Sequence, residues 1–160
     1  MSDPEPGPAA PFPLGPGLSA AVRDALLGAD AAPAREQLAS DVVGWLTTVA
    51  ADGLPRTSVI SFLWEGDGIL FYSRPDTPLV RDIAANGAVS FHLNCDPSGD
   101  HVVVIEGRAQ VVPLEQRSDV HPAYAAKYHE PLAHWGMDER ENADDFSLPI
   151  RIHPERIRLW

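Results

Sequence analysis

The segment from Ser73 to Gly87, SRPDTPLVRDIAANG, places an arginine just before the signals of a sharply defined helix start. Thr77 is a typical N-cap, because its hydroxyl accepts a hydrogen bond from a backbone N–H of the first turn. Pro78 suits the first helical position, where no N–H is needed. Free N–H groups and the helix dipole attract anions at such an end. The segment therefore indicates either a phosphate site or a plain connection between a strand and a helix.

Other arrangements of side chains that carry chemistry are missing from the sequence. Glycine-rich nucleotide loops, the HExxH motif and the nucleophile elbow do not occur. None of the six histidines has another metal ligand at a compelling spacing, so we predict no metal site. Cys95 with His92 or His101 is a conceivable nucleophile and base, but a small structural cysteine is the simpler interpretation. We assign no catalytic residue and expect a bound cofactor to perform any hard chemistry.

The composition favours a single domain that binds neither nucleic acid nor a membrane surface. A chain of 160 residues is long enough for one hydrophobic core. The net charge of −11 and the pI near 4.8 disfavour nucleic acids and anionic membranes, because both would repel the chain. No apolar run approaches the roughly 18 residues of a membrane span. Cys95 is the only cysteine, so we expect a reducing, cytoplasmic location.

The beginning of the chain differs in amino-acid composition from the rest. Residues 1–17 hold six prolines and three glycines, so we expect a flexible tail there and a single domain over residues 18–160. Residues 18–28 and 33–43 read as short helices. A third helix is predicted from Pro122 to Trp135, followed by an acidic segment that suits a solvated loop or a helix end.

From Val43 onward, alternating apolar residues and turn signals predict strands. The candidates are residues 44–50, 56–64, 69–73, 88–94, 101–114 and 148–160. Gly107 either kinks the strand candidate at residues 101–114 or divides it into two strands. Pro154 predicts a bend or an edge position in the candidate at residues 148–160. Antiparallel strands with short flanking helices predict a mainly β fold, a closed or nearly closed barrel that removes exposed sheet edges.

Much of the chain resembles a known protein family. The resemblance is carried by WLTTVAADGLPRTSVISFLWEGDGILFYSRPDTPLVRDIAANGAVSFHLN and by VVVIEGRAQVV, and it extends from about Val43 to Trp160. These blocks resemble the flavin-binding antiparallel split β-barrels of the pyridoxamine 5′-phosphate oxidase superfamily. They are most similar to the actinobacterial branch that depends on the deazaflavin coenzyme F420.

The resemblance implies a homodimer with two equivalent cofactor clefts at the subunit interface. It places the cofactor ring along Ser58, Val59 and Ile60, and the partner subunit's Trp160 would help to close the cleft. The cofactor phosphate would lie near the helix start that we identified from its capping residues. The residues that the resemblance implies there are Tyr72, Ser73, Arg74, Thr77, Pro78, Leu79 and Arg81.

One position departs from the family pattern. Relatives commonly carry a Thr-x-Lys-x-Arg pattern, whereas this chain has Leu79 in place of the lysine and keeps Arg81. Loss of a cation near a phosphate costs about 1–3 kcal/mol. Arg74, Arg56 or Arg108 are the candidates to compensate.

Three functions therefore remain open. The first is an oxidoreductase that uses F420 to transfer a hydride to an electron-poor organic substrate. The second is an FMN-dependent enzyme of the pyridoxamine-phosphate-oxidase type, since the single phosphate of FMN needs fewer cations. The third is a non-catalytic flavin or haem carrier, for which His92 and His101 are the candidate axial ligands.

Overall fold

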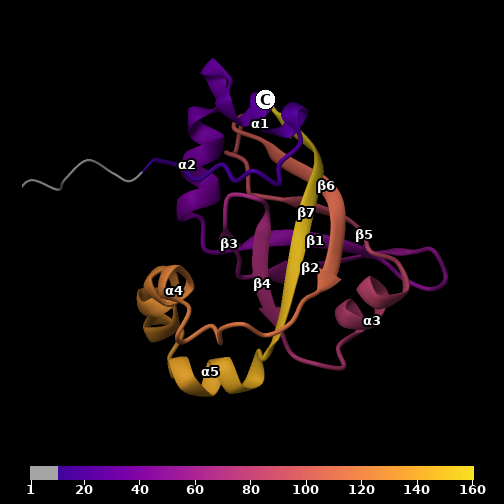
Figure 1. Ribbon diagram of the computed structural model, residues 1–160, viewed down its shortest axis with the longest axis vertical. Coiled ribbons are helices and arrows are strands. Elements are labelled where there is room, and N and C mark those ends of the chain that lie inside the picture. The colour runs from indigo at the N-terminus through magenta and orange to yellow at the C-terminus, as the bar shows by residue number, and fades with distance from the viewer. Residues whose placement is uncertain (1–10) are drawn as a thin grey trace, which may run out of the picture.

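The computed structural model describes residues 11–160, which form a curled antiparallel sheet with helices at its margins (Figure 1). The sheet contains β1 (Gly44–Val49), β2 (Pro55–Ile60), β3 (Leu63–Trp64), β4 (Ile69–Ser73), β5 (Ala88–His92), β6 (Val103–Val111) and β7 (Leu148–Leu159). The helices are α1 (Ala20–Leu27), α2 (Ala32–Ser40), α3 (Pro78–Ala85), α4 (Pro122–His134) and α5 (Glu139–Asp145), with a 3₁₀ turn η1 (Ala29–Ala31). The prediction of a mainly β antiparallel barrel is confirmed.

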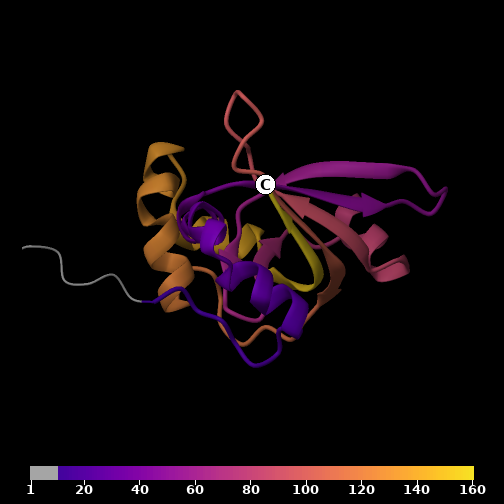
Figure 2. The ribbon, with the colours of Figure 1, turned by 90° about the horizontal axis from the view of Figure 1, so that it is seen from above.

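The strand order is β2-β1-β5-β6-β7-β4-β3, and each pair of neighbours is antiparallel. The last strand of the chain, β7, therefore lies inside the sheet, between β6 and β4 (Figure 1). The two edge strands, β2 and β3, are consecutive in the sequence. Figure 2 shows the β1–β2 hairpin extending from the body on the side opposite α4.

The core follows from the alternation of side chains along the strands. On β4, every residue is buried, because Ile69 and Phe71 face the barrel core while Leu70 and Tyr72 face α4. The N-terminal helices cover one end of the barrel with Val22, Leu26 and Leu38. The largest fully enclosed barrel residues are Phe62, Phe71, Phe91, Leu46, Ile105 and Ile150.

A β-bulge bends the two longest strands. Glu106 pairs with Arg156, and Gly107 pairs with Pro154, so Glu155 is an extra residue on β7. A Cβ on Gly107 would lie 2.1 Å from the carbonyl oxygen of His153, which explains the glycine. Pairing between β7 and β4 ends at Ile152, so Pro154 lies where that side of the strand has no partner. The predicted irregularities at Gly107 and Pro154 thus coincide in one bulge, and β6 is a single strand.

The predicted flexible tail is only partly described. Residues 1–10 lie outside the described part of the chain, whereas residues 11–17 pack against β3 and the turn that follows it. The Phe12 ring stacks on Trp64 at 5.6 Å, and the Trp64 indole N–H donates to the carbonyl oxygen of Pro13 at 2.8 Å. The Gly15 N–H donates to Gly66 at 3.1 Å. The flexibility of residues 1–17 stays a prediction, although Phe12 supplies apolar contacts that an average over prolines and glycines conceals.

Candidate functional site

A cavity of about 520 Å³ lies between the barrel and the α4–α5 segment. Figure 1 shows α4 and α5 on one side of the end of β4 and α3 on the other. The cavity is lined by three groups of residues: the end of β2 and the residue after it, the end of β4 with the start of α3, and side chains of the α4–α5 region. The predicted site residues that line it are Ser58, Val59, Ile60, Tyr72, Ser73, Thr77, Pro78 and Leu79.

The helix start at this cavity has the expected geometry. The Thr77 hydroxyl accepts a hydrogen bond from the Val80 N–H at 3.3 Å, and Pro78 takes the first helical position. The Ser73 hydroxyl lies 3.5 Å from that of Thr77 and donates to the carbonyl oxygen of Arg74. The Leu79 N–H makes no hydrogen bond within residues 11–160. One backbone donor and two hydroxyls therefore converge where the sequence predicts a phosphate.

The predicted arginines lie outside the cavity lining. Arg74 forms an ion pair with Asp145 at 3.0 Å and stacks on the Phe146 ring at 4.8 Å from its centroid. Arg81 donates to the carbonyl oxygen of Asp76. The pairing of Arg74 was not predicted, because Asp145 belongs to the acidic segment that was expected to be a solvated loop or a helix end.

The two arginines considered as replacements for the family lysine are also paired with acids. Arg56 lies 3.7 Å from the buried Asp82, and Arg108 lies 3.5 Å from Glu155. The described residues that line the cavity include no lysine or arginine. The positive potential at the helix start therefore comes from the backbone N–H groups and not from an arginine side chain.

Three tyrosines form the inner wall of the cavity. The Tyr124 ring lies 4.9 Å from that of Tyr72 and 4.6 Å from that of Tyr128. Burial raises the pKa of Tyr72 to about 12 and raises the pKa of Tyr124 and of Tyr128 well above the ordinary value. All three phenols are therefore protonated at neutral pH and can donate a hydrogen bond, as Tyr72 and Tyr128 do in the structure.

The Tyr128 hydroxyl joins α4 to the link between the edge strands. It accepts a hydrogen bond from the Phe62 N–H at 2.6 Å and lies 2.8 Å from the carbonyl oxygens of Val42 and Phe62. Because Lys127 donates to the Phe62 carbonyl at 2.9 Å, the single proton of Tyr128 can serve Val42. This face of α4 is therefore turned toward the barrel, with Tyr128 buried and Lys127 half-buried.

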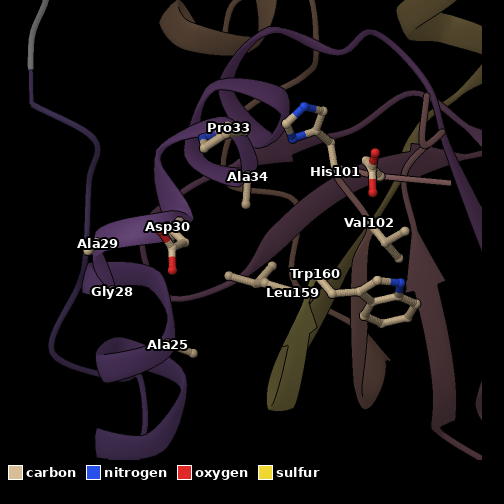
Figure 3. A pocket seen from close by; sticks show the side chains of 12 residues that line it. Ala25, Gly28, Ala29, Asp30, Pro33, Ala34, His101, Val102, Leu159 and Trp160 are labelled. Atoms are coloured by element: carbon tan, nitrogen blue, oxygen red, sulfur yellow. The ribbon is translucent and has the colours of Figure 1, made fainter. Parts of the chain in front are cut away.

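Trp160 lies at a different cavity, of about 640 Å³, at the far end of β7. Figure 3 shows Leu159 pointing toward the residues of α1 and the turn after it, with the Trp160 ring pointing the other way. His101 and Val102 border the same cavity. The Trp160 side chain is 63% exposed in the single chain. Its predicted role in a partner's cleft stays a prediction.

The histidines lie away from the 520 Å³ cavity between the barrel and the α4–α5 segment, which we call the main cavity. His92 stacks on Trp45, and His121 lies 3.1 Å from Glu65. None of the six histidines lines the main cavity, and residues 11–160 hold no cluster of three or more histidine, cysteine or acidic side chains suited to a metal ion. Within the same residues, no helix has the length and apolar character that a membrane crossing needs.

Comparison with known proteins gives a family match and structural neighbours. The model of the pyridoxamine 5′-phosphate oxidase family matches residues 32–160. No curated protein sequence matches the chain. Among solved structures, a putative pyridoxamine 5′-phosphate oxidase from Listeria innocua is 25% identical, with a TM-score of 0.57, over 77% of this chain and 91% of that one.

Two further neighbours share the fold but have different stated roles. A protein described as an F420 reductase is 20% identical, with a TM-score of 0.58, over 77% of this chain and 94% of that one. The haem storage protein HutZ from Vibrio cholerae is 17% identical, with a TM-score of 0.56, over 80% of this chain and 93% of that one. At these identities, the likeness establishes the split-barrel fold alone.

Proposed function

Since the chain belongs to the pyridoxamine 5′-phosphate oxidase family, we propose that its main cavity binds a flavin-type cofactor and that the protein is an oxidoreductase. The proposed cofactor is F420, and the proposed hydride acceptor is an electron-poor organic molecule. One observation carries the proposal. The cavity has the edge strand β2 on one wall and the capped start of α3 on another, in a space of about 520 Å³. That volume is typical of small-molecule sites.

The residues present fit the ring of such a cofactor. β2 is an edge strand, so the backbone groups of Ser58, Val59 and Ile60 that do not pair with β1 are free to hydrogen-bond the polar edge of a flat ring. Leu79, Leu132 and Phe146 add apolar surface to the cavity. This combination of apolar walls and a few polar backbone groups is typical of cofactor sites.

The residues at the start of α3 fit a phosphate, although less strongly than in a site with a lysine. The Leu79 N–H and the hydroxyls of Ser73 and Thr77 would hold it. In this proposal, Arg74 and Arg81 contribute only after each gives up its present partner. The absence of a cation from the described lining makes FMN, with its single phosphate, the alternative cofactor.

The bound cofactor would supply the hydride chemistry, and the chain would supply position and environment. The β2 backbone would fix the ring edge, and the helix start would fix the phosphate. The tyrosine wall would exclude water from the inner part of the cavity, which strengthens polar interactions there. We assign no acid or base among these residues.

We also propose that the protein is a homodimer in the cytoplasm. The exposed Trp160 suits contact with a second subunit, where it would cover that subunit's cofactor cleft.

Titration of the purified protein with F420 and, separately, with FMN tests the proposal, with ring fluorescence as the signal. We expect F420 to bind with a dissociation constant on the order of micromolar and FMN to bind more weakly. The reverse preference would make this an FMN protein. If neither ligand binds, the oxidoreductase proposal fails, and a storage, haem-binding or purely structural role becomes the leading hypothesis.

Two variants locate the binding site. Val59→Glu puts a charge on the proposed ring wall and is expected to weaken cofactor binding by about tenfold or more. Val120→Glu is the matched control, because Val120 has a similar exposure, 59% against 50% for Val59, and does not line the cavity. Equal effects of the two substitutions would place the cofactor elsewhere.

Leu79→Lys restores the family lysine at the start of α3. We expect it to tighten F420 binding by about tenfold or more, because the cavity lining described here holds no other cation. Unchanged affinity would show that the phosphate does not lie at this helix end.

The haem alternative is not favoured at this cavity. An iron ligand is expected from a histidine, and none of the histidines in the described chain lines it. His101 borders the cavity at the other end of β7, where the ligand titration with haemin is the direct check.

A further inference from the structure

The lining of the main cavity includes one enclosed hydroxyl group that has no hydrogen-bond partner within the described residues. The Ser118 hydroxyl is enclosed, and its residue is only 5% exposed. The Tyr124 ring is buried between two other tyrosines, and its hydroxyl makes no hydrogen bond to residues 11–160, but this oxygen is not fully enclosed and stays accessible from the cavity. By contrast, the Tyr72 hydroxyl donates to the Gln116 carbonyl at 2.7 Å, and Tyr128 is fully paired.

Unpaired hydroxyls are rare in protein interiors, because a buried polar group without a partner loses its hydrogen bonds to water. Both residues line the main cavity, so a ligand there can reach this part of the wall. Both also border a small adjoining space of about 10 Å³, together with Asn142. That space is at the lower limit for one water molecule, which is the simplest alternative partner.

The surroundings of these two hydroxyls disfavour a negatively charged ligand. The main cavity has no lysine or arginine in its described lining, and Asp119 and Glu139 border the small adjoining space. An anionic group at this inner end of the cavity would therefore find no cation in the described lining. Leu132, Trp135 and Met137 line the neighbouring part of the cavity and offer apolar contact.

Building on the function proposed above, we propose that Ser118 and Tyr124 form a polar subsite for one oxygen atom of an uncharged, largely apolar substrate. A carbonyl oxygen would accept hydrogen bonds from both hydroxyls, and Asn142 would contribute its amide. The subsite would orient the substrate in the inner part of the cavity, beside the β2 residues that are proposed to contact the cofactor ring. Burial raises the pKa of Tyr124, so its phenol stays a donor throughout the neutral and mildly alkaline range.

Three naphthalene derivatives of similar size test the proposal on the full chain without added cofactor. They are 2-acetylnaphthalene, which has a carbonyl oxygen, 2-ethylnaphthalene, which has none, and 2-naphthoate, which is an anion. Their fluorescence reports binding directly. We expect the ketone to bind about three- to tenfold more tightly than the hydrocarbon, because it gains hydrogen bonds, and the anion to bind most weakly. Equal affinities for ketone and hydrocarbon would overturn the proposal and leave a bound water as the partner of the hydroxyls.

Two variants assign the selectivity to the named atoms. Ser118→Ala and Tyr124→Phe each remove one hydroxyl and retain most of the side chain, and thermal unfolding verifies that each variant folds. Each is expected to weaken ketone binding about threefold or more and to leave hydrocarbon binding unchanged. Ser147→Ala is the matched control, because Ser147 follows α5 but does not line the cavity. Equal losses for both ligands in either variant would mean that the hydroxyl acts only on local structure.

The same variants separate this subsite from the cofactor proposal. F420 and FMN titrations of both variants are expected to match those of the unmodified chain, because the proposed cofactor contacts lie on β2 and α3. If neither cofactor binds any of these proteins but the ketone selectivity persists, the oxidoreductase proposal fails and the subsite stands as a ligand site. If cofactor affinity falls in Ser118→Ala or Tyr124→Phe while ketone selectivity is absent, the hydroxyls belong to the cofactor site and the subsite proposal is refuted.

Discussion

Lys127, the only lysine of the chain, gives a prediction whose size follows from the structure. Its ammonium group lies 3.9 Å from the centroid of the Phe62 ring and donates to the Phe62 carbonyl. Burial lowers the pKa of Lys127 to about 8, and the attraction of Asp41 opposes this only in part. A fall from the ordinary value of 10.5 to about 8 corresponds to about 3 kcal/mol. Because the group keeps some contact with solvent, we expect about 2 kcal/mol in practice.

The sign of the pH dependence follows from proton counting. Between pH 8 and 10.5, the unfolded chain keeps the proton of Lys127 while the folded chain loses it. The unfolded state then binds more protons, so the free energy of unfolding rises with pH across this window. Below about pH 8 both states are protonated, and the full cost of burying the charge is present.

Lys127→Met is the perturbation that isolates this effect. Methionine keeps an unbranched stem against Phe62 but cannot carry the charge. We expect the free energy of unfolding of the unmodified chain, relative to that of the variant, to increase by about 2 kcal/mol between pH 8 and 10.5. The ionisation of tyrosines in the unfolded chain affects both proteins equally and cancels in the difference.

Urea unfolding at a series of pH values measures the difference directly. A second measurement follows the single lysine side-chain signal by NMR, which titrates near pH 8 if the reasoning is right. A difference that stays flat with pH, together with a signal that titrates near 10.5, would refute the burial of Lys127 and the pairing scheme built on it.

Three further substitutions test particular contacts by their effect on the free energy of unfolding, measured in urea. Tyr128→Phe leaves the Phe62 N–H without its partner at 2.6 Å and is expected to lower the free energy of unfolding by about 2–4 kcal/mol. Tyr124→Phe removes a hydroxyl that makes no hydrogen bond to the described residues and should lower it much less. Similar costs for the two would contradict the difference in pairing. Ser118→Ala removes an enclosed hydroxyl without a partner in the described chain and is expected to stabilise the protein by about 1 kcal/mol. A loss of stability would indicate that a water satisfies it. Gly107→Ala should cost about 2 kcal/mol or more, since its Cβ would lie 2.1 Å from a backbone oxygen. Gly53→Ala meets open space and should cost only the backbone strain of its positive φ of 85°, about 1 kcal/mol. Equal costs for the two would contradict the close approach at Gly107.

Local sequence signals were sufficient for most of the fold. The cap at Thr77 and the turn signals between the strand candidates 44–50 and 56–64 act within a few residues, so they correctly predicted the start of α3 and the positions of β1 and β2. Gly107 and Pro154 each indicated an irregular strand. Their pairing in one bulge, which depends on the register of two distant segments, was not visible in either alone.

The candidate site was predictable only where it depends on local structure. The residues of β2, β4 and the start of α3 line one cavity because neighbouring strands and the following helix bring them together. Ser118 lies in a connecting loop without a pattern, and the ion pair of Arg74 depends on where α5 packs. Tyr124 and Tyr128 lie in the helix that was predicted from Pro122 to Trp135. Which hydroxyl would be paired depended on the distant Phe62 backbone.

The position of β7 also determines when the sheet can be completed during synthesis of the chain. Residues 148–159 separate the four-stranded unit β2-β1-β5-β6 from the pair β4-β3, and each side bonds to β7. On a ribosome, the first 147 residues can emerge without the segment that joins these two parts. Until then, β6 and β4 expose unpaired edges that can bind other chains. Nascent chains stalled before residue 148 should therefore recruit chaperones, and release of the final strand should end that dependence.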